Sequence, residues 1–248
     1  MLFTISGIIV DKVKIKEIDY LVTFFTPRGK IKVLAKGAQK SKRRFLNLLE
    51  ELTYVRAHLR KPRKGYYLIL EKVDLIYQLE SPWKDLKKYL LLSYITETLN
   101  YTTPPFLRPK DFEIIVEFLK EVDGSENIYL NKFFWEFKWL QICGLTPHLE
   151  SCINCGITPK KVSYFSISRG GFLCFRCRDL RDIPLSSNQI DLLRKMVRIN
   201  NLKELKYELK TLKEEEKRGL FSLGEKFFLF HLDWEPKSLK VFKEKYGD

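Results

Sequence analysis

Four cysteines constrain the fold of this 248-residue chain more than any other feature. They form two Cys-x2-Cys pairs, separated by eighteen residues: Cys152, Cys155, Cys174 and Cys177. Each pair offers two thiolates from one tight turn, and a stretch of this length can form a small β unit that brings the second pair opposite the first. Four sulfurs complete a tetrahedral coordination sphere and leave no position for water or substrate. We therefore predict one structural Zn²⁺ ion and no zinc catalysis.

Two disulfides would use the same four cysteines, and unrelated buried thiols are a further alternative. The N-terminus lacks a charged region followed by an apolar one, so we expect no signal peptide and a compartment that keeps thiols reduced. That expectation favours zinc. The fifth cysteine, Cys143, ends an apolar helical pattern and is predicted to be a core residue.

Hydrophobic residues make up 45% of the chain, enough for sizeable cores. The longest apolar runs, at residues 89–95 and 227–232, are much shorter than the roughly 20 residues of a membrane-spanning helix. We therefore expect a cytoplasmic protein with no membrane partner.

Basic residues exceed acidic ones, and the formal net charge of +14 indicates a polyanionic partner. Two stretches contain no acidic residue, one from Arg28 to Arg44 and one from Arg56 to Lys64. The alternative is that these are ordinary solvated lysines of a thermostable protein. Such a protein is expected to mix acidic and basic residues, as residues 203–217 do, whereas these two stretches are only basic. We predict nucleic-acid contacts from the basic side chains of both stretches: Arg28, Lys30, Lys32, Lys36, Lys40, Lys42, Arg43, Arg44, Arg56, Arg60, Arg63 and Lys64.

The first 80 residues predict five strands, at residues 3–10, 20–26, 30–35, 52–60 and 66–77, with a brief helical or irregular insert around residues 43–49. Five short strands match an OB-type barrel, with a small SH3-like barrel as the alternative. Alternation puts Lys30 and Lys32 on one strand face and Ile31 and Val33 on the other. The aromatic residues of these strands are expected in the core rather than as platforms for bases: Tyr20, Phe24, Phe25, Tyr54, Tyr66 and Tyr67.

Helical periodicity follows the predicted barrel. One helix is expected from an N-cap at Ser81, a second from Pro109 or Asp111 to Gly124, and a third, buried on several sides, from Ser125 towards Cys143. Ser187 is expected to cap another, and residues 202–217 are amphipathic. We predict an α+β multidomain protein: an OB domain at 1–80, an α-helical domain at 81–150 and 183–248, and a zinc-binding insert at 151–182.

No enzymatic signature is present in the sequence. The dipeptide Gly29-Lys30 lacks the upstream glycine of a P-loop, and three histidines (His58, His148 and His231) are widely separated. Glu214 to Glu216 form a charged helical face rather than a nuclease site. We predict that the protein is not an enzyme.

The chain resembles the bacterial RecO family along nearly its whole length. The matching segments are Glu17 to Thr26, Gly29-Lys30, Ala35 to Ala38, Arg44-Phe45, Trp139-Leu140, Gly144 to Pro147, His231-Leu232 and Lys237-Ser238. The family pattern differs at Gln39, where arginine is frequent, and at Asp233 and Pro236, which replace glycine and leucine. Pro236 should break or start a helix.

The resemblance implies an OB fold, a helical domain and a zinc element. It also implies a recombination mediator that binds single- and double-stranded DNA and anneals complementary strands. With RecR it would help RecA replace single-strand-binding protein on DNA. Lys36, Lys40, Lys42, Arg43 and Arg44 occupy the family's basic loop. We expect a monomer at the nucleoid; an RNA-binding or transcription accessory module is the alternative.

Overall fold

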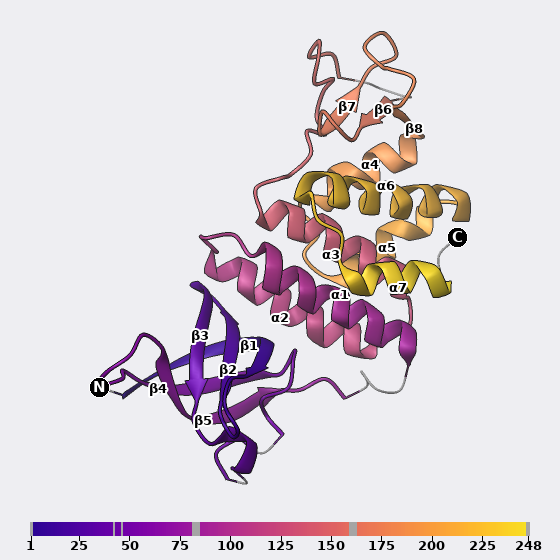
Figure 1. Ribbon diagram of the computed structural model, residues 1–248. Coiled ribbons are helices and arrows are strands. Elements are labelled where there is room, and N and C mark those ends of the chain that lie inside the picture. The colour runs from indigo at the N-terminus through magenta and orange to yellow at the C-terminus, as the bar shows by residue number, and fades with distance from the viewer. Residues whose placement is uncertain (1, 42, 46, 81–84, 159–162, 247–248) are drawn as a thin grey trace. The chain divides into compact units, whose positions relative to one another are not determined.

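The structure is a computed structural model that describes residues 2–41, 43–45, 47–80, 85–158 and 163–246 (Figure 1). The chain forms two compact units. The first comprises Met1–Asp123 and Pro236–Asp248, and the second comprises Gly124–Glu235. The domain boundaries at residues 80, 150 and 182 divide the chain more finely and stay a prediction.

The first unit begins with five strands that close into a barrel. They are β1 (Leu2–Lys14), β2 (Tyr20–Thr26), β3 (Gly29–Ala35), β4 (Tyr54–Arg60) and β5 (Leu68–Tyr77). The strand order around the barrel is β1-β2-β3-β5-β4. All neighbours pair antiparallel except β3 and β5, which run parallel where Val33 pairs with Leu68. This arrangement confirms the predicted OB-type barrel over the SH3-like alternative.

Strand alternation builds the barrel core. Val33 of β3 and Val55, Ala57 and Leu59 of β4 are fully buried, whereas Lys30 and Lys32 are exposed, as predicted. The insert between β3 and β4 is a 3₁₀ helix, η1 (Ala38–Lys40), followed by turns, which confirms the expected insert. Two of its apolar side chains, Phe45 and Leu49, are buried in the same core, so the insert is anchored to the barrel.

Three helices complete the first unit: α1 (Leu86–Thr102), α2 (Pro109–Gly124) and α7 (Lys237–Tyr246). Ser81, the predicted N-cap, lies outside the described residues, and the described part of α1 is capped by Asp85, which accepts a hydrogen bond of 2.8 Å from the Lys87 amide. The Phe112 ring of α2 stacks on Phe25 of β2, with centroids 5.6 Å apart. This contact joins the helices to the barrel.

Helix α7 packs against α1, although the two are far apart in the sequence (Figure 1). The Glu97 carboxylate of α1 accepts hydrogen bonds from the Lys237 and Ser238 amides, at 2.8 and 3.1 Å. Negative charge at this position complements the positive end of the helix dipole. Pro236 stands immediately before α7. Of the two effects predicted for this proline, breaking a helix or starting one, the structure shows the second.

The second unit contains α3 (Ile128–Ile142), α4 (Ser187–Met196), α5 (Leu202–Glu208), the 3₁₀ helix η2 (Leu209–Thr211) and α6 (Glu214–Leu232). Helix α3 is buried on nearly every side, as predicted, and packs against α6. Ser186 rather than Ser187 caps α4, through a capping box with Gln189. The helical stretch expected at 202–217 is interrupted, because η2 turns the chain so that Leu209 and Leu212 are both buried.

Between α3 and α4 lies a small sheet of β6 (Ser163–Ser166), β7 (Gly171–Leu173) and β8 (Ile183–Leu185), in the order β7-β6-β8. The zinc-binding insert predicted from the cysteines falls on this sheet. Among the described residues, no helix is both long and apolar enough to cross a membrane.

Candidate metal centre and nucleic-acid interface

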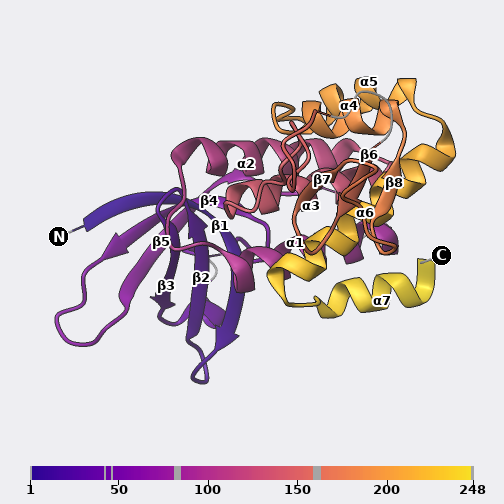
Figure 2. The same ribbon diagram turned by 90° about the horizontal axis from the view of Figure 1, so that it is seen from above.

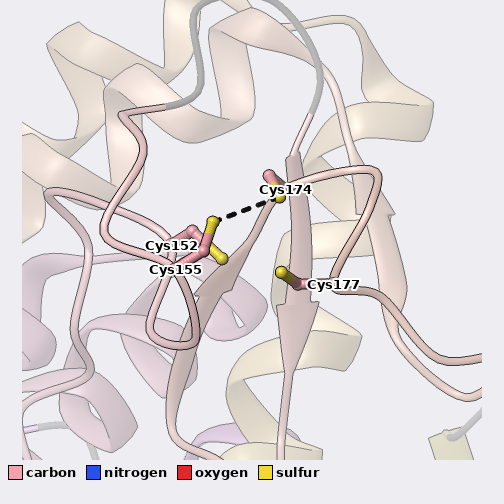
Figure 3. A group of neighbouring side chains, drawn as sticks. All are labelled: Cys152, Cys155, Cys174 and Cys177. Atoms are coloured by element: carbon pink, nitrogen blue, oxygen red, sulfur yellow. Dashed lines mark hydrogen bonds between the residues drawn. The ribbon is translucent and has the colours of Figure 1, made fainter.

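Two tight turns hold the four cysteines. The Cys152–Cys155 turn precedes β6 and is closed by a hydrogen bond of 2.8 Å from the Gly156 amide to the Cys152 carbonyl. The Cys174–Cys177 turn leaves the end of β7 and is closed by a bond of 3.1 Å from the Cys177 amide to the Cys174 carbonyl. The β6–β7 hairpin lies between the pairs in sequence and brings them face to face, as predicted (Figure 3).

The four sulfurs fit a tetrahedral metal ion. All of them lie within 4.8 Å of one another, and the Cys155 and Cys174 sulfurs are 3.7 Å apart. A Zn–S bond of about 2.3 Å sets the sulfurs of a regular tetrahedron about 3.8 Å apart. All five cysteines are free thiols, so the two-disulfide arrangement is not the one in this structure. The group can therefore bind a metal ion through all four sulfurs.

The thiols influence one another strongly. Burial disfavours the Cys152 thiolate, but backbone amides around it outweigh this effect and lower the pKa of Cys152 to about 6. At Cys155 the Ile157 amide favours the thiolate, yet the sulfurs of Cys152, Cys174 and Cys177 raise the pKa of Cys155 to about 12. Four adjacent thiolates repel one another unless a cation lies between them. A divalent ion bound between the four thiolates would offset this repulsion.

The surroundings of the cysteines resemble a structural site. Cys152 packs in a buried cluster with Tyr164 and Leu173, whereas Cys155 is exposed. The Asn154 side-chain amide donates to the Cys177 sulfur at 3.4 Å, which orients that ligand. An ion at this position would link the turn before β6 to the turn after β7, and it would have no free coordination position.

The predicted basic residues all belong to the barrel, but their environments differ. The basic loop, which we define as Lys36, Lys40, Arg43 and Arg44, is exposed around η1. Its backbone is anchored, because the Gly37 amide donates to the Asp19 carboxylate at 2.7 Å and the Arg44 guanidinium donates to the Lys36 carbonyl at 2.9 Å. None of these four side chains forms an ion pair within the described residues. Lys42 lies outside the described residues.

On β3 the two lysines are not equivalent. The Lys30 ammonium donates to the backbone carbonyl of Asn100 in α1, and burial together with the nearby Lys32 ammonium lowers the pKa of Lys30. Lys32 is exposed, as is Arg28 in the turn between β2 and β3. The Lys30 ammonium therefore already makes a hydrogen bond within the first unit, whereas Lys32 and Arg28 face solvent.

The basic residues of β4 have no acidic neighbour in their own segment, but the pairing of β4 with β5 brings carboxylates next to them. The Arg60 guanidinium pairs with Glu71 of β5 at 2.6 Å, and Arg56 lies opposite Asp74. Asp74 also accepts hydrogen bonds from His58 and Lys72, which lower the pKa of Asp74. These acids come from the neighbouring strand, so the sequence around Arg56 contained no sign of them.

The loop between β4 and β5, residues 61–67, lies outside the strand pairing of the barrel. Arg63 and Lys64 are exposed and form no ion pair within the part of the chain that the structure describes. Two aromatic predictions were wrong here, because β5 begins only at Leu68 and leaves Tyr66 fully exposed and Tyr67 half-exposed in the loop. Gly65, with a φ of +105°, turns the chain ahead of them. The other four aromatic residues are buried or half-buried, as expected: Tyr20, Phe24, Phe25 and Tyr54.

Comparison with known proteins gives a consistent family across both units. Residues 1–78 match the family model described as Recombination protein O N terminal, and residues 84–240 match Recombination protein O C terminal. A DNA repair protein RecO of Syntrophus aciditrophicus is 28% identical over 253 residues, which cover 96% of this chain and 94% of the relative. A DNA repair protein RecO of Caldanaerobacter subterraneus is 30% identical over 177 residues, or 70% of each chain.

Proposed function

Because the chain belongs to the RecO family of DNA repair and recombination proteins, we propose that it is a recombination mediator without enzymatic turnover. It binds single- and double-stranded DNA and anneals complementary strands. Together with RecR, it helps RecA load onto DNA that is coated with single-strand-binding protein. This work takes place in the cytoplasm, at the nucleoid.

The exposed basic loop carries the proposal. Lys36, Lys40, Arg43 and Arg44 stand on an OB-type barrel without acidic partners among the described residues, so their charge is available to phosphates. Phosphate contacts give affinity with little sequence preference, which a protein that anneals arbitrary complementary strands requires. Lys32 and Arg28 supply further exposed charge on the same barrel.

The metal centre has a supporting role in this proposal. Cys152, Cys155, Cys174 and Cys177 would hold one Zn²⁺ ion, which supplies a link between two turns and no chemistry. Such an ion would stabilise the small sheet between α3 and α4. The alternative of an RNA-binding or transcription accessory module receives no support from the family, whose models describe recombination proteins.

Strand annealing tests the mediator function. Purified protein should accelerate the pairing of complementary oligonucleotides, both bare and coated with single-strand-binding protein, and a titration with RecR should show complex formation. A protein that leaves the annealing rate unchanged, or that prefers structured RNA, contradicts the proposal. Cleavage of DNA that survives extensive purification contradicts the absence of enzymatic activity.

A paired substitution tests the basic loop. Replacing Arg43 and Arg44 by glutamine should weaken single-strand binding for every sequence and reduce the slope of log K against log salt by about 0.7 for each lost phosphate contact. Lys203→Gln with Lys206→Gln, two exposed charges of α5, is the matched control and should leave the slope unchanged. An unchanged slope in the arginine variant would locate the phosphate contacts elsewhere.

A further inference from the structure

The loop between β4 and β5 carries two aromatic rings in water. Tyr66 is fully exposed and Tyr67 is half-exposed, although tyrosine normally buries its ring. The loop projects away from the barrel near the N-terminus (Figure 2). The Tyr66 ring therefore contributes no burial to the folded chain.

Positive charge lies close to these rings in the sequence. Lys61, Arg63 and Lys64 belong to the same loop as the tyrosines, all three are exposed, and none forms an ion pair within the described ranges of the chain. The strand that follows the loop pairs in parallel with β3, the strand that carries Lys32, from Leu68 onward. Exposed rings and exposed cations thus belong to one loop of the barrel.

The ends of this loop are held in place. Arg60, the last residue of β4, pairs with Ile69 of β5 on one side and with Leu2 of β1 on the other. Its guanidinium bonds to Glu71 at 2.6 Å. Fixed ends limit the conformations open to the loop, which reduces the entropy lost on binding.

This combination matches an unpaired nucleic-acid strand. The cations attract phosphates of either a single strand or a duplex, but only a single strand can place the face of a base on an exposed ring. We propose that Tyr66, assisted by Tyr67, is a base-stacking platform that adds affinity for single-stranded DNA which double-stranded DNA does not gain. The inference rests on the proposed DNA-binding function and adds the residues that discriminate between the two substrates.

A substitution series tests the platform. Affinity is measured by fluorescence anisotropy for a labelled thymidine oligonucleotide, for an abasic strand of the same length and for a duplex. Tyr66→Ala should weaken binding to the thymidine strand about 5- to 150-fold, from a stacking contribution of about 1–3 kcal/mol per base. Its affinity for the abasic strand and the duplex should equal that of the wild type, because those ligands offer no free base. Tyr66→Phe keeps the ring and should bind like the wild type.

A matched control is Tyr207→Ala, which removes another exposed tyrosine, on α5, and should change no affinity. Since Tyr66 is fully exposed, its replacement should not disturb folding. Equal affinity of Tyr66→Ala and wild type for the thymidine strand overturns the platform, and so does an equal loss on all three ligands. If the wild type binds none of the three DNA ligands, the proposed function itself fails, so the two failures are distinguishable.

Discussion

A buried charge cluster in the second unit offers a strong test of how this fold is stabilised. The Lys132 ammonium of α3 lies 2.7 Å from the Glu136 carboxylate and 2.6 Å from Glu225 of α6. Glu136 is fully buried and Lys132 nearly so. Burial alone would disfavour the ammonium, but the two carboxylates outweigh it and raise the pKa of Lys132. The cluster therefore joins α3 to α6 through one cation shared by two anions.

The perturbation is Lys132→Met, which keeps most of the side-chain volume and removes the charge. Two carboxylates would then remain close together with no cation. Breaking a buried ion pair from one side costs about 3–5 kcal/mol, and we expect the free energy of unfolding to fall by that amount near neutral pH. Urea unfolding followed by tryptophan fluorescence reports on this region, because Trp135 and Trp139 are buried in α3 and stack 5.2 Å apart.

The pH dependence has a definite sign. In the variant, burial and mutual repulsion hold a glutamate pKa above its unfolded value. The resulting penalty is absent below the unfolded pKa, about 4.3, and grows as the pH rises through the folded pKa. The variant should therefore approach the wild type as the pH falls from 8 to 5.

Two controls isolate the cause. The triple variant Lys132→Met, Glu136→Gln and Glu225→Gln removes all three charges and should recover most of the lost stability. Lys120→Met breaks an ion pair of 2.7 Å with Glu117 on the surface, and it should cost at most about 1 kcal/mol. A loss below about 1 kcal/mol in Lys132→Met, independent of pH, would refute the reasoning.

Three further predictions follow from close contacts and ligands. Gly224→Ala would put a Cβ 2.7 Å from the Phe133 ring and should destabilise the second unit by about 1–3 kcal/mol in urea unfolding, whereas Gly219→Ala in the same helix approaches the Gln189 amide nitrogen only to 3.2 Å and should cost less. Glu97→Ala should destabilise the start of α7 by about 1 kcal/mol, seen as faster amide exchange across residues 237–246; unchanged exchange would contradict the capping role. Cys177→Ser should reduce bound zinc, measured by elemental analysis, and stability before it affects DNA binding; normal folding with lost DNA affinity would make the metal unit a contact surface.

Local patterns were sufficient for much of this protein. Alternation along β3 and β4 predicted which side chains enter the barrel, because successive residues of a strand face opposite sides. The spacing of Cys152, Cys155, Cys174 and Cys177 predicted the metal-binding group, because each pair needs only one turn and one hairpin joins them. The burial of α3 was visible in its aromatic residues on every side.

Other properties depend on neighbours that the sequence does not reveal. Glu71 lies beside Arg60, and Asp74 lies opposite Arg56, only because β5 pairs with β4. A segment with no acidic residue in its own sequence therefore has carboxylates next to it in the fold. Because β5 starts only at Leu68, Tyr66 lies in solvent, although the residue types at 66–77 had predicted a strand that includes it. Charge pairing and exposure are set by contacts between distant segments. Residue pattern therefore predicted the elements and the ligands, whereas strand pairing determined which cations and which rings remain available to a partner.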